Sequence, residues 1–425
     1  MNAQEILQEA TNSSFAIWFL IGAGLVFFMQ AGFAMVETGF TRAKNAGNII
    51  MKNLMDFCIG TLMYIILGFG LMMSEDYIMG IIGVPNLDIF TNYNSFNWSQ
   101  FVFQLVFCAT AATIVSGAMA ERTKFSAYCI YSGAISLIVY PIEAGWVWNL
   151  GGNGWLQQLH FVDFAGSAVI HSVGGMAALV GAIIVGPRIG KYTKRSNGSI
   201  RSNAIAGHSI TLGALGCFIL WFGWYGFNAG SALAANGLAA HAFMTTSVSA
   251  AAGLVSWMLI EVFSEGKTTL VGASTGLVIG LVAITPGAGF VPMWAAVICG
   301  LLVSPICYFG VKLIKGKLKI DDALDAFGCH GIGGIWGGIA TGLFGMTSIN
   351  GVAKWNGLVF GETRLFVAQI IGIFVSIAVA VVGSLICIAI VRIFTPLRVE
   401  ERAEKIGLDV SEHGENAYPS FNGLD

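Results

Sequence analysis

Two histidines occupy the same short pattern in the two halves of the chain. His171 and His330 each begin an H-x-x-G-G motif, and an aspartate, Asp163 or Asp322, precedes each histidine by eight residues. A neutral imidazole donates a hydrogen bond from one ring nitrogen and accepts one at the other. Two such rings in contact would form a short polar link able to exchange protons. The duplicated motif therefore predicts a pair of histidines that act together.

Composition indicates the environment in which these histidines lie. Of the 425 residues, 56% are hydrophobic and only 10% are charged, whereas a soluble domain carries roughly 25% charged residues. The formal net charge of -2 provides no basic surface for nucleic acid. Apolar stretches of about 20 residues, each long enough to cross a bilayer, follow one another along the chain. The chain is therefore expected to be an all-α, multi-pass protein of the cell (inner or plasma) membrane, with the lipid bilayer as a partner.

The alternation of apolar runs and polar breaks predicts eleven transmembrane helices. They cover residues 15–39, 47–73, 99–120, 125–149, 163–186, 203–227, 236–262, 268–286, 290–314, 326–346 and 365–395. Nineteen of the 21 Lys and Arg residues fall on one side, and only Lys354 and Arg364 fall on the other. Because positively charged loops stay in the cytoplasm, the N-terminus is expected outside and the C-terminus inside. Residues 1–395 would form the transmembrane domain and residues 396–425 a cytoplasmic tail.

The two histidine motifs then fall on the fifth and tenth helices, which run in opposite directions. Five helices repeated with inverted topology are typical of transporters, so the prediction is two inverted five-helix repeats plus an eleventh helix. Eight residues of helix span about 12 Å, which places both histidines near the membrane midplane. The glycines that follow would let the two helices cross closely.

A structural alternative for the histidines is that two buried rings merely satisfy each other's hydrogen bonds. The inverted repeat, the matched depth and the high cost of ionisable groups in lipid favour a role in a pathway instead.

Three aromatic residues and one serine are predicted near the outer ends of helices three, four and six. They are Phe107, Trp148, Phe227 and Ser231. Aromatic faces attract a small cation by about 0.5–2 kcal/mol, and a hydroxyl oxygen accepts a hydrogen bond from it. These side chains suit a vestibule that binds a small cation weakly. Alternatively, Trp148 belongs to an interfacial aromatic belt and the phenylalanines fill space.

The acidic residues near or within the spans have less specific interpretations. Asp163 at the start of helix five suits an N-cap, and its charge would also stabilise a nearby cation; the two roles are compatible. Glu37, Asp56 and Glu143 are interpreted as packing or loop partners, because the sequence offers no constellation around them.

Four separated motifs carry a resemblance to a known family. They are Val162 to Gly166 with His171, Gly226 to Ser231, Asp321 to Gly331, and Gly407 to Tyr418. In this order and on these helices they resemble the Amt/Mep/Rh superfamily, and the tail motif is similar to the Amt branch. The resemblance covers nearly the whole chain. It implies the ammonium transporter fold, a role in nitrogen uptake, no cofactor and no enzymatic activity.

The family's site residues transfer onto matching positions of this chain. The resemblance implies an outer ammonium-recruitment site of Phe107, Trp148 and Ser231, with Asp163 nearby. Phe107 and Phe227 would stack as a pore gate, and His171 and His330 would be the twin histidines of conduction. Carrying an intact ion through an apolar pore costs many kcal/mol, so ammonium would lose a proton near the phenylalanines and pass as ammonia. The sequence leaves open whether that proton follows.

The resemblance also implies partners. The family assembles as a homotrimer in which each protomer has its own ammonia channel. The charged stretch from Arg398 to Lys405 would by default be a solvated surface. Resemblance implies instead a tail that packs on the inner face, couples neighbouring protomers and responds to a PII-type regulatory protein.

Three competing functions remain candidates. A neutral-gas channel of the Rh type would share the fold, although Trp148 and the tail favour the Amt branch. A metal site or membrane enzyme would need a third or fourth ligand beside the histidines, and no His or Cys cluster in the sequence offers one. A sensor that signals through a separate protein is not distinguished from a transporter by the sequence.

Overall fold

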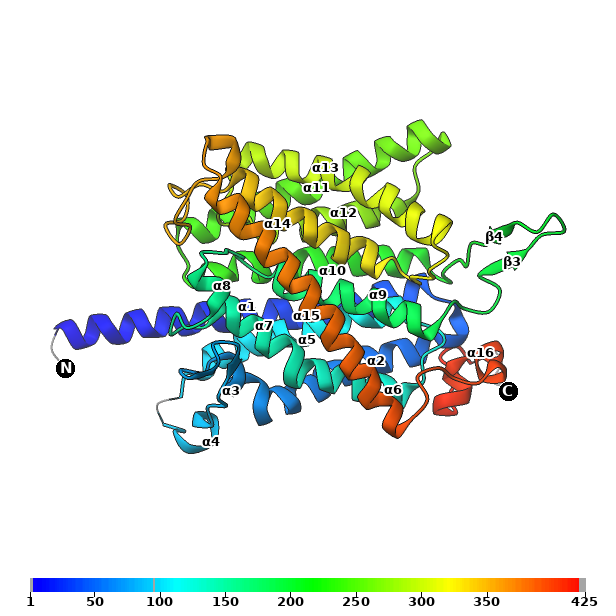
Figure 1. The fold of residues 1–425 in the computed structure, drawn as a ribbon, viewed down its shortest axis with the longest axis horizontal. Helices are drawn as coiled ribbons and strands as arrows, with labels where there is room; N and C mark the ends of the chain where they lie inside the picture. Colours follow the sequence, from blue (N-terminus) through cyan, green and yellow to red (C-terminus); the bar gives the residue numbers. More distant parts are fainter. Residues whose placement is uncertain (1–2, 95, 420–425) are drawn as a thin grey trace.

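A computed structural model describes residues 3–94 and 96–419 of the protein as a helical bundle (Figure 1). The α-helices are α1 Ala3–Phe40, α2 Ala46–Met63, α3 Phe69–Met72, α4 Asp88–Thr91, α5 Trp98–Ala118, α6 Phe125–Ala134, α7 Tyr140–Trp148, α8 Trp155–Gln158, α9 Val173–Val185, α10 Ile210–Asn228, α11 Gly237–Glu265, α12 Leu270–Ile284, α13 Met293–Val311, α14 Gly333–Phe344, α15 Arg364–Phe394 and α16 Glu401–Ile406.

Short elements of other kinds interrupt or extend these helices. The π-helical turns are Tyr64–Gly68, Ile135–Val139, Ser167–Ser172, Lys312–Lys317, Phe327–Ile332 and Asp409–His413, and the 3-10 turns are Ala43–Asn45, Gly230–Ala232 and Leu358–Phe360. Two small antiparallel hairpins pair β1 Tyr77–Ile78 with β2 Ile82–Gly83 and β3 Tyr192–Lys194 with β4 Ile200–Ser202. Both hairpins lie in loops, so helices alone form the bundle.

Helical segments occur at all eleven ranges predicted from the sequence. Among the described residues, nine helices are long and apolar enough to cross a membrane, and α12 is a shorter apolar helix. The exact number of spans and their orientation stay predictions. In Figure 1 the two ends of the chain lie at opposite ends of the bundle, as an odd number of spans requires.

Two predicted helix starts precede the observed ones by several residues, for local reasons, whereas α1 begins at Ala3, well before the predicted start at residue 15. The sixth predicted span began at 203, but α10 begins at Ile210 because the Ser209 side chain caps it by accepting a hydrogen bond from the Leu212 N–H. The fifth was predicted from Asp163, but the helical backbone starts at Ser167, since the Asp163 carboxylate caps the turn from outside it. Side-chain caps set both boundaries.

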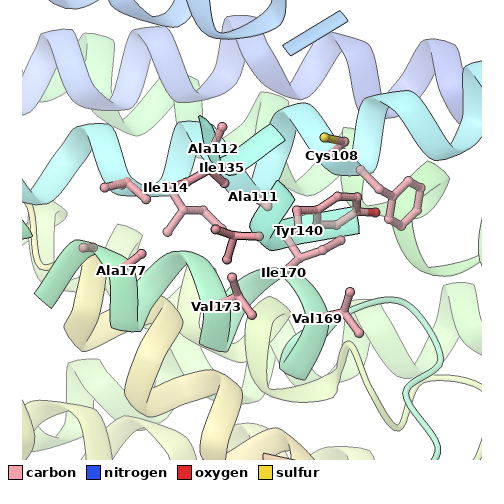
Figure 2. Close-up of a cluster of buried hydrophobic side chains, with 14 of the residues drawn as sticks. Cys108, Ala111, Ala112, Ile114, Ile135, Tyr140, Val169, Ile170, Val173 and Ala177 are labelled. Atoms are coloured by element: carbon pink, nitrogen blue, oxygen red, sulfur yellow. The ribbon is translucent and has the colours of Figure 1, made fainter. Parts of the chain in front are cut away.

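The bundle places small residues where helices meet and large apolar residues on its outside. Ala111 and Ala112 of α5 pack near Val169 and Val173 on the other side of a shared core (Figure 2). Outward-facing residues of long helices stay exposed, as with Phe263 at 86% and Phe374 at 72% of their full exposure. An apolar exterior on so many long helices fits immersion in lipid.

Charged side chains are buried together where the loops meet at the C-terminal end of the bundle. Glu121 accepts hydrogen bonds from Arg42 and from Arg188, whose Nη1 lies 2.9 Å away. Arg188 also binds the Asp321 carboxylate with two nitrogens, at 2.8 and 3.0 Å. Burial alone would raise the pKa of Asp321, but the hydrogen bonds and charge of Arg188 outweigh it and hold this pKa well below its usual range. This cluster joins three loops.

The tail packs onto the same loops. Asp409 accepts hydrogen bonds from the backbone N–H groups of Gly47 and Asn48, at 3.0 and 2.8 Å, and Glu412 accepts one from Phe125 N–H at 2.9 Å. These N–H groups belong to the first turns of α2 and α6, which have no partner within their own helices. Two tail carboxylates therefore cap two helices of the bundle, and the tail is not a free solvated strip.

Candidate functional site

A cavity of about 510 Å³ is lined in part by the loops that follow α7, α8 and α10. In Figure 1, α8, which contributes Gln157 to this lining, lies at the end of the bundle opposite α16. The cavity walls include all four residues predicted for recruitment, Phe107, Trp148, Asp163 and Ser231. Trp148 is the last residue of α7, and Ser231 lies in the 3-10 turn that follows α10. Helix ends and loops thus supply these side chains, except for Phe107, which lies near the middle of α5.

Aromatic rings form the floor of this cavity. The rings of Phe107 and Phe227 stack, with centroids 4.4 Å apart and planes inclined by 23°. Trp148 meets Phe107 edge to face at 6.1 Å. Both phenylalanines are buried, at 2% and 0% of full exposure, and Phe107 lines the cavity with Phe227 stacked behind it.

Two polar side chains at the cavity are oriented by the backbone. The Ser231 hydroxyl donates to the Phe227 carbonyl at 2.7 Å, which leaves its oxygen lone pairs as acceptors. The Trp148 indole N–H donates to the Asp163 carbonyl at 2.8 Å. Ser231 is thereby prepared to accept a hydrogen bond, and Trp148 is held with its ring against the cavity.

Asp163 is engaged as a helix cap. Its two carboxylate oxygens accept hydrogen bonds from the backbone N–H groups of residues 166 to 169, at 2.7 to 3.3 Å. Asp322 does the same at the start of the other histidine helix, accepting from residues 326 to 328. The capping interpretation is thus confirmed, and any effect of Asp163 on a cation in the cavity would come from its charge nearby.

His171 and His330 meet in the middle of the bundle. Each lies in a π-helical turn, Ser167–Ser172 or Phe327–Ile332. Their Nδ1 atoms are 3.1 Å apart, so one ring donates and the other accepts, and the pair shares one proton at this contact. Both rings are buried, at 0% and 6% of full exposure.

Glycines make this meeting possible, as the motif predicted. A Cβ on Gly175 would lie 2.2 Å from the backbone nitrogen of Gly331. A Cβ on Gly334 would lie 2.7 Å from the Ser167 carbonyl oxygen. No side chain fits at either distance, so the two histidine helices cross at backbone contact.

The histidine pair continues the column of rings that begins at the cavity floor. Phe227 lies 5.5 Å from His171 between ring centroids, and the Trp224 ring stacks on His171 at 5.2 Å. Phe33 lies 6.1 Å from His330 on the far side. His330 also lines a second cavity, of about 70 Å³, on the side of the tail. The rings thus run in unbroken contact from one cavity to the other.

Two members of this column were not predicted from the sequence. Trp224 stands three residues before Phe227 on α10, so its place on the same helix face was a signal that helical spacing could have given. Phe33 lies in an apolar run of α1 with nothing in its surroundings to distinguish it. Within residues 3–94 and 96–419, no group of three His, Cys, Asp or Glu side chains is placed to hold a metal ion.

Helices with an apolar exterior, enclosing two cavities joined by a buried column of rings, define a polytopic membrane protein of the channel or transporter class. Residues 17–418 match the model of the Ammonium Transporter Family, and the chain belongs to that family of transporters, which are not enzymes.

Known relatives match over most of their length. Ammonium transporter Amt2 of Archaeoglobus fulgidus is 42% identical over 95% of this chain and 88% of its own. The ammonium transporter of Bacillus subtilis is 39% identical over 93% of this chain and 96% of its own.

Solved structures of similar fold include two Amt and Mep proteins. A structure described as a sensor Amt protein has a TM-score of 0.87 and 35% identity, covering 96% of this chain and all of that one, at 100%. Mep2 of Saccharomyces cerevisiae has a TM-score of 0.80 and 30% identity, covering 92% of this chain and 88% of its own.

Proposed function

We propose that this protein is an ammonium transporter that recruits ammonium at the outer aromatic cavity and passes ammonia along the twin-histidine column. Family membership supports the substrate. One observation supports the route: the contact of Trp148, Phe107, Phe227, His171 and His330 in sequence between two cavities.

Recruitment follows from the chemistry of the outer cavity. A cation against the faces of Trp148 and Phe107 is attracted by their ring quadrupoles, by roughly 0.5–2 kcal/mol. The Ser231 oxygen accepts one N–H bond from it. This attraction is weak enough that it does not trap the ion in the cavity, as conduction requires.

Passage below the phenylalanines calls for a neutral species. The stacked rings of Phe107 and Phe227 offer no hydrogen-bond partner, and an ion stripped of water there pays many kcal/mol. Ammonium therefore gives up one proton at the level of these rings, and that proton passes either back to the outer solution or along the His171–His330 pair. Ammonia then reaches the His171–His330 pair, whose ring nitrogens offer polar contacts in an apolar passage.

Assembly and location belong to the same proposal. The protein is a multi-pass membrane protein, and we place it in the cell (inner or plasma) membrane as a homotrimer. The docked tail suits a PII-type regulatory protein at the inner face, because tail and loops form one surface there.

The test is uptake by proteoliposomes that hold the purified protein, with an ammonium gradient as the driving force. Ammonium-dependent flux and current above those of protein-free liposomes, without potassium flux, are expected. A protein that binds ammonium yet moves none would instead be a sensor, the second candidate, which the likeness to the sensor Amt protein favours.

A further inference from the structure

The inner cavity contains an acidic group that the transport route described so far does not use. Glu37 of α1 lines this cavity of about 70 Å³ together with His330. It is buried, at 4% of full exposure. Phe40, at the end of α1, lines the same cavity, so the cavity extends from the histidine pair toward the tail-side loops.

The carboxylate is held by one of its two oxygens. Glu37 Oε2 accepts hydrogen bonds from Ser116 Oγ at 2.8 Å and from Asn53 Nδ2 at 3.1 Å. In the described part of the chain, these are the side-chain hydrogen bonds that the carboxylate receives. The other oxygen, Oε1, lies beside Gly117, another residue of the cavity wall. One oxygen thus anchors the group and the other is left toward the cavity.

Charge around Glu37 is not balanced. The titratable groups that interact with it or share its cavity are Lys52 and Asp56 of α2, Tyr128 of α6, Cys217 of α10, and Cys329 and His330 of the second histidine turn. Two buried carboxyl groups, Glu37 and Asp56, therefore face one amine, that of Lys52. One carboxyl group of this cluster has no cationic partner and is available to carry an exchangeable proton.

We propose that Glu37 is the inner proton-exchange site of the pathway, acting on ammonia that has passed His330. This inference rests on the proposed transport function and extends it to the inner side. Ammonia in the cavity takes the proton of the Glu37 carboxyl group, which yields ammonium and a carboxylate. The carboxylate then takes up a proton from the cytoplasmic solution. Conversion to the ion on this side prevents ammonia from returning through the apolar column.

The direct test is Glu37→Gln in vesicles of known orientation, with the outside solution fixed and the inside pH varied across neutrality. An amide still accepts from Ser116 and fills the same space, but it exchanges no proton. Initial ammonium flux should fall by roughly 100-fold or more, since a positioned general acid or base typically contributes about 10²–10⁴-fold, and it should lose its dependence on inside pH.

Glu261→Gln is the matched control. Glu261 is a buried carboxylate of α11, at 7% of full exposure, and is bound to Thr269 rather than to the cavity. This variant should keep wild-type flux and inside-pH dependence. If Glu37→Gln fails to assemble, the double variant Glu37→Gln with Lys52→Met serves in its place, because it removes the charge of the buried lysine together with that of the carboxylate.

The outcomes separate this inference from the proposed function. Wild-type flux and inside-pH dependence in the Glu37 variant would overturn the role of Glu37 in proton exchange. A loss of flux that only follows a loss of assembled protein would overturn it as well. Absence of ammonium flux in the wild-type protein would instead remove the transport function, and this inference with it.

Discussion

Trp148 combines two interactions that a substitution can separate. Its ring faces the outer cavity, and its indole N–H donates to the Asp163 carbonyl at 2.8 Å. The first is the proposed binding contact for a cation, and the second positions the ring and the start of the first histidine helix. A leucine removes both, whereas a phenylalanine keeps an aromatic face.

Trp148→Leu should therefore raise the half-saturating concentration of ammonium or methylammonium by roughly 2- to 30-fold, the equivalent of 0.5–2 kcal/mol of cation–π attraction. Trp148→Phe should lie much closer to wild type. Uptake assays at matched protein levels measure both. Equal impairment of the two variants would assign the effect to the lost hydrogen bond, and an unchanged half-saturation in the leucine variant would remove Trp148 from the site.

The residues of the column were predictable to different degrees. The two histidines follow from their duplicated motif, whereas the roles of Phe107 and Phe227 as a stacked pair were implied only by the family resemblance. Trp224 and Phe33 are ordinary apolar residues in apolar helices, so only the tertiary structure distinguishes them from their neighbours. From the sequence, Glu37 was interpreted only as a packing or loop partner. Its place in a cavity could not be predicted, since residues distant in the chain build that cavity.

The two histidine helices share a feature that the hydrophobic pattern of the sequence does not predict. Each begins with a π-helical turn, capped from outside by an aspartate. Hydropathy alone predicted apolar spans through these regions and therefore could not place the π turns or the true start at Ser167. The glycines that let the two helices cross were predictable, because they follow each histidine at the same spacing in the H-x-x-G-G motif.

Gly175→Ala should disturb the crossing of these helices. Its Cβ would lie 2.2 Å from the backbone nitrogen of Gly331, which cannot move away as a flexible side chain can. We expect lower thermal stability of the assembled protein and reduced ammonium flux, since the histidine pair must separate. Gly24→Ala on α1 is the control, because its Cβ would meet no atom within 4 Å, and it should be neutral or slightly stabilising. Identical behaviour of the two variants would refute the crossing argument.

The buried charged cluster of Glu121, Arg188 and Asp321 should stabilise the protein. Asp321→Asn removes a charge that Arg188 holds with two hydrogen bonds, and breaking a buried ion pair costs about 3–5 kcal/mol. The melting temperature should therefore fall clearly. Glu401→Gln in the exposed pair with Lys405 should leave it unchanged. Equal melting temperatures for all three proteins would contradict a stabilising role for the cluster.

The pH dependence of stability has a defined sign at this cluster. Arg188 lowers the pKa of Asp321 in the folded protein below its ordinary value of 3.8, against the opposing effect of burial. The contribution of Asp321 is then fully present above pH 3.8 and is lost as the pH falls through the lowered folded-state pKa. In Asp321→Asn this part of the acid sensitivity should disappear, which melting curves at decreasing pH would show.

At the scale of the whole molecule, the tail is both a cap and a surface. Truncation after Pro396 removes the carboxylates of Asp409 and Glu412 from the first turns of α2 and α6. The bundle should stay folded and keep the oligomeric state of the full-length protein, because the tail contributes no span, but it should melt at a lower temperature. Binding of a PII-type regulator should be lost. A truncated protein that captured the regulator as well as the full-length protein would show that the tail is not its docking surface.

The overall architecture was the most predictable feature, since eleven apolar runs and a strongly one-sided distribution of Lys and Arg leave few alternatives. The tail was less predictable. From the sequence alone, its charged residues fit a solvated surface equally well. Only the contacts with the loops in the folded structure show which tail carboxylates cap helices.

Passage of ammonia along the His171–His330 pair is tested by replacing each histidine with alanine. Initial ammonium flux, current and potassium flux are recorded in proteoliposomes for wild type, His171→Ala and His330→Ala at matched levels of assembled protein. Each alanine removes the 3.1 Å contact between the Nδ1 atoms and leaves the partner ring unpaired, at a cost of roughly 1–3 kcal/mol. Both variants should lose ammonium flux or admit potassium, whereas wild-type flux, current and potassium exclusion in both would show that the pair is not part of the pathway.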